Sequence, residues 1–148
     1  MKRFGYFFLI FYLSLSGCDL GPHVKWEGYT PAKMAEALKS GKPTIAYFYA
    51  AWCGPCMKLK YDTFTDARVV RALEPFARIK VDMSYSHSKQ IIEIAEHYQI
   101  QGFPTIVFFN SAGEEITRFS GFVSANRLLR LIKQESDRLG FARAAASE

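Results

Sequence analysis

Two cysteines separated by two residues are the feature of this sequence that most clearly predicts chemistry. Cys53 and Cys56 stand where a continuous apolar run ends and a segment with helical spacing begins. A cysteine at a helix start lies close to unpaired N–H groups and a partial positive charge, which favour its thiolate over its thiol. Cys56 follows about one helical turn later, near enough for its sulfur to bond that of Cys53. The pair therefore predicts thiol–disulfide exchange, with Cys53 as the nucleophile and Cys56 as the resolving cysteine.

The two residues between the cysteines suit the same chemistry. Pro55 fits the first turn of a helix, where its missing N–H would have had no partner. Gly54 carries no side chain, so another protein chain can approach the sulfur of Cys53 closely.

A metal site or a pair of buried structural thiols is the alternative interpretation. Zinc would need two more cysteine or histidine ligands at usable spacing. The remaining candidates are scattered singly through the sequence: Cys18, His23, His87 and His97. We therefore expect no metal ligands, no cofactor, and histidines that lie on the surface.

The elements that position the cysteines alternate between strand and helix patterns. Thr30 and Pro31 predict the start of a helix that ends at Gly41. The run Thr44–Ala50 predicts a central strand buried on both faces. Further strands are expected over 78–82, 105–109 and 115–119, with a hairpin turn at 110–113. Further helices are expected from 53 to a break near 63, over 66–73, around 91–98 and from 125 to 140. This order predicts an α/β sandwich, with a mixed central sheet and helices on both faces.

Length and composition agree with one globular domain. The chain has 148 residues, of which 49% are hydrophobic, so a core can form without a disulfide framework and the cysteines remain available for chemistry. The net charge is +5, with no block or stripe of basic residues and no zinc-finger spacing. This argues against nucleic acid as a partner. We expect a monomer.

The first seventeen residues read as an export signal. Lys2 and Arg3 precede an uncharged run, Phe4–Gly17, whose 14 residues fall short of the roughly 20 that a membrane-spanning helix needs. Leu15-Ser16-Gly17-Cys18 resembles the lipobox of bacterial lipoproteins, which implies that Cys18 is lipidated and becomes the first residue, and Asp19 resembles the signal that retains lipoproteins in the inner membrane. The alternative is an ordinary signal peptide that is cut before Gly17 and leaves a soluble periplasmic protein.

The domain boundaries follow from these patterns. We expect a lipoprotein signal at 1–17, a tether at 18–29, the folded domain at 30–140 and a frayed tail at 141–148.

Two motifs carry a resemblance to the thioredoxin superfamily, and it covers nearly the whole chain from about Pro31 to Leu139. They are Ala51-Trp52-Cys53-Gly54-Pro55-Cys56 and Gly102-Phe103-Pro104-Thr105. The stretch from 58 to 70 is most similar to the C-terminal thioredoxin-like domain of DsbD, a membrane disulfide reductant. The resemblance implies a thioredoxin-like sandwich and a cis proline at Pro104 that faces the cysteines. It also implies that the backbone of Phe103 pairs with a substrate strand, and that substrate is bound by Trp52, Gly54, Pro55, Phe103 and Pro104.

Two positions depart from the family pattern. Thioredoxins carry a buried aspartate six residues before the first cysteine, where this chain has Tyr47. The DsbD domain carries a glutamate four residues after the second cysteine, where this chain has Lys60. The proton acceptor for Cys56 is therefore water or a relay through Tyr47, and Tyr47 is equally compatible with ordinary core packing.

The predicted function is that of an exported, membrane-tethered oxidoreductase that reduces disulfides of periplasmic proteins. The Gly54-Pro55 dipeptide is the one thioredoxin uses at about −270 mV, which favours reduction. The resemblance further implies a membrane electron relay of the DsbD kind as partner, on the periplasmic side of the bacterial inner membrane. The alternatives are a disulfide oxidase or isomerase, a copper or zinc carrier that uses the same thiols, and a non-catalytic adaptor.

Overall fold

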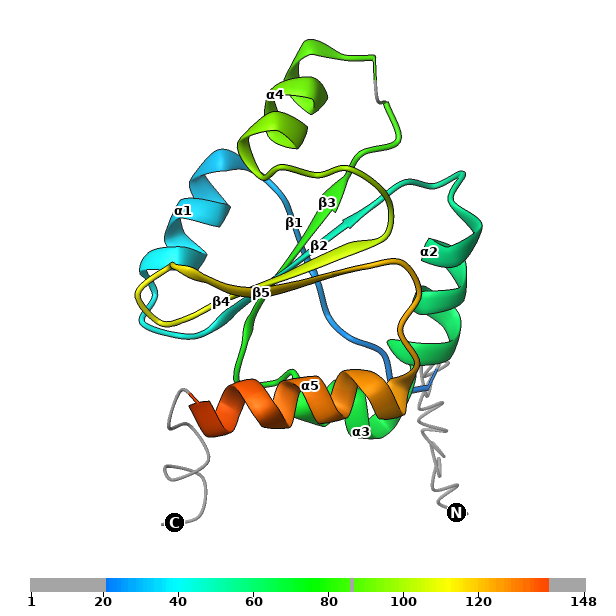
Figure 1. Cartoon of the computed structure of the whole chain (residues 1–148), viewed down its shortest axis with the longest axis vertical. Coiled ribbons are helices and arrows are strands. Elements are labelled where there is room, and N and C mark those ends of the chain that lie inside the picture. Colours follow the sequence, from blue (N-terminus) through cyan, green and yellow to red (C-terminus); the bar gives the residue numbers. More distant parts are fainter. Residues whose placement is uncertain (1–20, 86, 139–148) are drawn as a thin grey trace, which may run out of the picture.

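Helices cover both faces of a five-stranded sheet in the computed structural model, which describes residues 21–85 and 87–138 (Figure 1). The elements follow in the order β1 (Glu27–Gly28), α1 (Pro31–Lys39), β2 (Thr44–Tyr49), α2 (Gly54–Lys58), the π-helix η1 (Leu59–Thr63), α3 (Ala67–Ala72), β3 (Ala77–Asp82), α4 (Lys89–His97), β4 (Thr105–Phe109), β5 (Glu115–Ser120) and α5 (Ala125–Arg138). No helix in this described part of the chain is both long and apolar enough to span a bilayer.

The sheet is mixed, as the alternation of strands and helices predicts. Its strands lie in the order β1-β3-β2-β4-β5. β1, β3 and β2 run parallel, whereas β4 is antiparallel to both β2 and β5. The predicted α/β sandwich with a mixed central sheet is therefore confirmed. Because β2 lies at the centre, the loop that leaves its carboxyl end is held by strands on both sides.

Each face of the sheet builds its own hydrophobic core, because successive side chains of a strand point to opposite faces. In β2, Ile45 and Tyr47 join the core under α3 and α5, while Ala46 and Phe48 join the core under α1 and α4. Figure 1 shows these two pairs of helices on opposite sides of the sheet. The fully apolar pattern of β2 is thus explained by burial on both faces.

The segment before α1 differs from the expected tether. Val24 is buried, and Glu27 and Gly28 pair with β3 as a two-residue edge strand. Trp26 packs its ring 4.9 Å from that of Phe64 and 5.5 Å from that of Tyr47. A two-residue strand is too short to display alternation, so the sequence pattern does not reveal it. The domain therefore begins before Thr30.

Local capping explains where the helices begin. The side chain of Thr30 accepts a hydrogen bond from the Lys33 N–H, and that of Asp66 accepts one from the Arg68 N–H, so both predicted starts are confirmed. Gly41 adopts a positive φ of 72° just after α1, which glycine tolerates. Within α1, Met34 and Ala37 are buried and Ala35 is exposed.

The helix after Cys53 runs as α2 and then continues as η1 to Thr63, so the predicted break is present but the π-helical stretch was not foreseen. In α5, Leu128 is fully buried and Ile132 is buried. Several expectations fall outside the described residues, namely the signal at 1–17, the lipidation of Cys18, the position of Leu139 and the tail at 141–148.

Candidate active site

Cys53 caps the helix that follows the central strand. Its backbone is extended, with φ −86° and ψ 107°, and its sulfur accepts a hydrogen bond from the Cys56 N–H at 3.2 Å. Its carbonyl oxygen accepts from the Cys56 and Met57 N–H groups, each at 3.1 Å. Pro55 occupies the first turn, as predicted. The sulfur of Cys53 therefore lies against the N–H groups that favour a thiolate.

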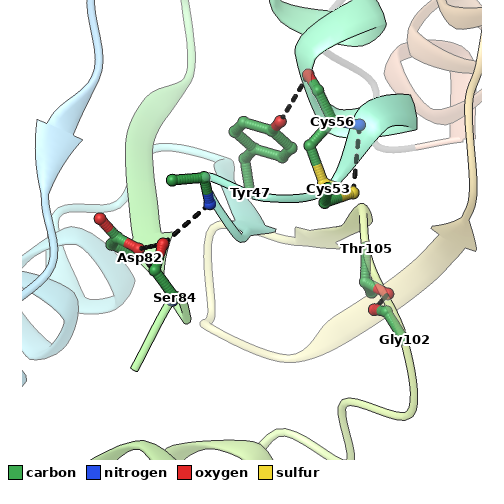
Figure 2. Close-up of a disulfide and its surroundings, with 8 residues drawn as sticks. Tyr47, Cys53, Cys56, Asp82, Ser84, Gly102 and Thr105 are labelled. Carbon is green, nitrogen blue, oxygen red and sulfur yellow. Dashed lines mark hydrogen bonds between the residues drawn. A yellow bond between two sulfur atoms is a disulfide. The ribbon is translucent and has the colours of Figure 1, made fainter. Parts of the chain in front are cut away.

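The two cysteines form a disulfide, so this structure is the oxidised state of the pair (Figure 2). Their Cα atoms are 5.2 Å apart. Cys53 is 6% exposed and Cys56 is 1% exposed, and both pack with Ala50 in a small apolar cluster. Because Cys53 is the more accessible of the two, its sulfur is the one that a second protein can reach.

The loop before β4 faces the disulfide. The Phe103–Pro104 peptide bond is cis, as the family resemblance implies, and Phe103 packs against the cluster that contains both cysteines. Gly121 donates its N–H to the Pro104 carbonyl at 2.7 Å, and the Thr105 hydroxyl donates to the Gly102 carbonyl at 2.8 Å (Figure 2). These bonds hold the loop from both ends.

The other predicted substrate-binding residues surround the cysteines and are open to a partner. Trp52, Gly54 and Pro55 are exposed, and Trp52 has 65% of its surface in solvent. The rings of Trp52 and Phe103 meet edge-on with their centres 5.9 Å apart. Trp52, Gly54, Pro55 and the half-buried Phe103 thus lie around the disulfide, whereas Pro104 is itself buried.

Tyr47 is both a core residue and a hydrogen-bond donor. Its ring stacks on Tyr49 at 5.3 Å and meets Phe64 edge-on at 5.1 Å, and its hydroxyl donates to the Cys56 carbonyl at 3.2 Å (Figure 2). Burial, reinforced by Tyr49, raises the pKa of Tyr47 well above its ordinary value. The hydroxyl therefore keeps its proton, and Tyr47 cannot serve as the base for Cys56.

Lys60 lies on the exposed side of η1. Its ammonium is 5.0 Å from the centre of the Tyr61 ring. The neighbouring Lys58 places its ammonium 4.7 Å from the centre of the Phe122 ring, which belongs to the loop after β5. Both lysines therefore lie on the surface near Cys56, and each contacts an aromatic ring.

Two polar residues of the site were missed by the sequence analysis. Asp82 ends β3 and accepts hydrogen bonds from Ser84 and from the Tyr49 hydroxyl. Ser84 in turn accepts from the Ala51 N–H, two residues before Cys53. Burial opposes ionisation of Asp82, but the hydrogen bonds from Ser84 and Tyr49 and the charge of Lys80 outweigh it and lower the pKa of Asp82. Asp82 could have been noticed in the sequence as an acidic residue at the carboxyl end of a predicted strand. No local sequence pattern singles out Ser84.

Residues 21–85 and 87–138 contain no cluster of three His, Cys, Asp or Glu side chains that could hold a metal ion. The three histidines, His23, His87 and His97, are exposed.

Known proteins share this fold and these motifs. The model of the thioredoxin-like domain family matches residues 30–136. The thiol:disulfide interchange protein DsbD of Actinobacillus pleuropneumoniae is 36% identical over 107 residues, which cover 70% of this chain and 18% of that protein. The DsbD of Campylobacter jejuni is 36% identical over 98 residues, which cover 66% of this chain and 17% of that protein. The chain thus matches less than a fifth of the length of these relatives.

Solved structures give the same assignment. A thioredoxin from Thermus thermophilus superimposes with a TM-score of 0.66 and 27% identity, over 80% of this chain and 91% of that one. The oxidised C-terminal domain of DsbD from Neisseria meningitidis superimposes with a TM-score of 0.61 and 27% identity, over 70% of this chain and 90% of that one. With the Cys53–Cys56 disulfide at the helix start, the chain belongs to the thioredoxin-like domain family.

Proposed function

We propose that this protein is a thiol–disulfide oxidoreductase that reduces protein disulfides on the periplasmic side of the bacterial inner membrane, to which lipidated Cys18 tethers it. The observation that carries the proposal is the position of Cys53. Its sulfur accepts the Cys56 N–H at the helix start, beside the cis-Pro104 loop and the exposed Trp52. This arrangement combines an activated sulfur with a surface that another protein can occupy.

The reaction transfers two electrons through sulfur alone. In the reduced enzyme, the Cys53 thiolate attacks one sulfur of a substrate disulfide, so that a mixed disulfide forms and the other substrate sulfur leaves as a thiolate. Cys56 then loses its proton and attacks the sulfur of Cys53, which releases the second substrate thiolate. The substrate gains two electrons and takes up two protons, and the Cys53–Cys56 disulfide of this structure is regenerated.

Proton transfer from Cys56 does not use a buried carboxylate in this proposal. The side chain bonded to its backbone is Tyr47, which donates and does not accept. We therefore assign the proton of Cys56 to water, which reaches the pair once the mixed disulfide has opened it.

The direction of the reaction follows from the dipeptide between the cysteines and from the relatives. Gly54-Pro55 is the pair that thioredoxin uses at about −270 mV, whereas a strong oxidant lies near about −120 mV. Relatives named thiol:disulfide interchange proteins support a place in a chain of disulfide exchange. A reductant in an oxidising compartment must be recharged, so we propose a membrane electron relay of the DsbD kind as the donor and exported disulfide proteins as substrates.

The redox potential of the Cys53–Cys56 pair tests the direction. We expect equilibration with glutathione or dithiothreitol buffers to give a value near that of thioredoxin, about −270 mV. A value above about −150 mV would identify an oxidase or isomerase instead. Metal analysis of the reduced protein, purified without chelator, tests the carrier alternative, and stoichiometric copper or zinc would support it.

Trapping tests the proposal that the substrate is a protein. In Cys56→Ser the mixed disulfide at Cys53 cannot be resolved, so we expect covalent complexes with exported proteins in cells that express the full chain. Cys53→Ser with Cys56 intact is the matched control and should capture none. If the two variants capture the same proteins, Cys53 is not the attacking residue.

A further inference from the structure

The loop that follows β3 is bonded to the segment that leads to Cys53. The Ser84 hydroxyl oxygen accepts the Ala51 N–H at 2.8 Å, and the Ser84 carbonyl accepts the Trp52 indole N–H at 3.1 Å. Figure 2 shows Ser84 between Asp82 and the backbone that precedes the disulfide. One residue therefore holds both the backbone and the side chain immediately before the nucleophile.

Asp82 fixes the direction of these hydrogen bonds. Its Oδ1 atom accepts from the Ser84 N–H at 2.9 Å and also from the Ser84 hydroxyl. Because the only proton of that hydroxyl goes to Asp82, its oxygen is left to accept from Ala51. The Tyr49 hydroxyl donates to the second carboxylate oxygen at 3.3 Å, which ties the end of β2 to the same side chain.

The surface that this loop supports is aromatic. Trp52 is 65% exposed although its indole N–H is bonded, and its ring meets that of Phe103 edge-on. Tyr85, which directly follows the carbonyl that holds the indole, is 78% exposed. A large apolar side chain that is already held in one orientation loses less conformational freedom when a partner binds it. Fixed, exposed aromatic rings of this kind are typical of binding surfaces.

We propose that Ser84 is a positioning residue that presets Trp52 for protein substrates, and that Tyr85 is a specificity-determining residue that binds an apolar side chain next to the substrate disulfide. This inference rests on the proposed reduction of protein disulfides and adds a substrate class to it. The preferred substrates carry aromatic or large aliphatic residues beside the disulfide. A small disulfide reaches Cys53 without touching either residue.

Two kinds of substrate test the positioning role. One is hydroxyethyl disulfide, and the other is a pair of disulfide peptides that differ only in phenylalanine or serine beside the cysteine. For Ser84→Ala we expect kcat/KM with the phenylalanine peptide to fall about tenfold through KM. The substitution removes the hydroxyl that bonds Asp82 and Ala51, so the backbone carbonyl that accepts from the Trp52 indole is held less firmly. Turnover of hydroxyethyl disulfide should fall clearly less than turnover of the phenylalanine peptide. Ser84→Thr keeps the hydroxyl and should restore peptide turnover.

The matched control for Ser84 is Ser40. Its hydroxyl also makes two hydrogen bonds, to the Ala37 carbonyl and from the Lys42 N–H, but it lies at the end of α1, away from the disulfide. Ser40→Ala should therefore leave both substrates unaffected. A fluorescence readout adds to the kinetics. With Trp26→Phe as the background, Ser84→Ala should change the emission or anisotropy of Trp52, and Ser40→Ala should not.

Tyr85 is tested by a separate variant. Because its side chain is exposed, we expect the alanine variant to fold normally, so a changed substrate preference reports on binding. Tyr85→Ala should reduce the preference for phenylalanine over serine peptides about threefold or more, as loss of one aromatic contact implies. Tyr61→Ala, at a tyrosine of similar exposure on η1, should leave that preference unchanged.

Each outcome bears on a defined claim. A wild-type enzyme that reduces hydroxyethyl disulfide but shows no preference between the peptides overturns the inference and leaves the proposed function standing. Equal effects of Ser84→Ala on small and peptide substrates also overturn it, because they would indicate a purely structural role. An enzyme that reduces neither substrate overturns the proposed function, and the inference with it.

Discussion

The hydroxyl of Tyr47 donates a hydrogen bond to the carbonyl oxygen of Cys56 across 3.2 Å. This bond links the central strand β2 to the helix that carries Cys56. It occupies the position where the wider family holds a carboxylate, and it replaces a group that could accept a proton with one that donates. The site therefore keeps a connection between strand and helix but not a buried base.

Removing that hydroxyl should destabilise the fold without removing activity. In Tyr47→Phe the Cys56 carbonyl loses one donor and keeps the Leu59 N–H, so we expect the free energy of unfolding of the oxidised protein to fall by about 1 kcal/mol. Urea unfolding measures this value. Because Tyr47 is not the base, the disulfide-reducing rate should stay within about twofold of wild type. A large loss of rate would show that Tyr47 takes part in proton transfer.

A substitution in the core tests how α5 is held. Leu128 is fully buried in the core that contains Phe108, and truncation leaves a cavity. Leu128→Ala should lower the free energy of unfolding by about 3 kcal/mol. Its neighbour Leu129 is only partly buried, so Leu129→Ala serves as the control and should cost clearly less. Equal losses for the two variants would contradict the packing of α5 described above.

The stability of the protein should depend on Asp82 as the pH falls. The pKa of Asp82 is lower in the folded state than its ordinary value, so its ionised form stabilises the fold above the unfolded pKa of about 4. That contribution is lost as the pH falls through the lowered folded pKa. Asp82→Asn should therefore destabilise the protein more at pH 7 than at pH 3, as measured by urea midpoints. The exposed Asp62 provides the control, and Asp62→Asn should alter neither midpoint appreciably.

The mature N-terminus tests the proposed anchor. If Cys18 is lipidated, mass spectrometry of the full chain purified from membranes should show a protein that begins at Cys18 and carries acyl groups. Cys18→Ala should then move the protein from the membrane fraction to the soluble fraction while the Cys53–Cys56 chemistry is retained. An unmodified mature protein beginning at Gly17 would rule out the anchor.

Local patterns predicted those parts of the fold that depend on neighbours in the chain. Thr30 and Asp66 cap their helices because a side-chain oxygen only needs to reach an N–H two or three residues ahead. The strand β1 was missed because Glu27 and Gly28 are held by pairing with β3, about fifty residues further along the chain. The continuation of α2 as the π-helix η1 also has no signal in the residue spacing.

The sequence by itself determined which residues could carry the chemistry, since the Cys53–Cys56 spacing and Pro55 at the first helical turn predict a redox pair. The family resemblance carried by Phe103–Pro104 implies a proline loop that faces this pair. Only the tertiary structure decided how that pair is supported. Asp82 at the end of β3 holds Ser84 in the loop that follows, and Ser84 bonds Ala51 and Trp52 just before Cys53. The Tyr47 hydroxyl of β2 bonds the Cys56 carbonyl. Hydrogen bonds between residues that are distant in the chain depend on how the strands are ordered in the sheet, and short-range periodicity carries no information about that order.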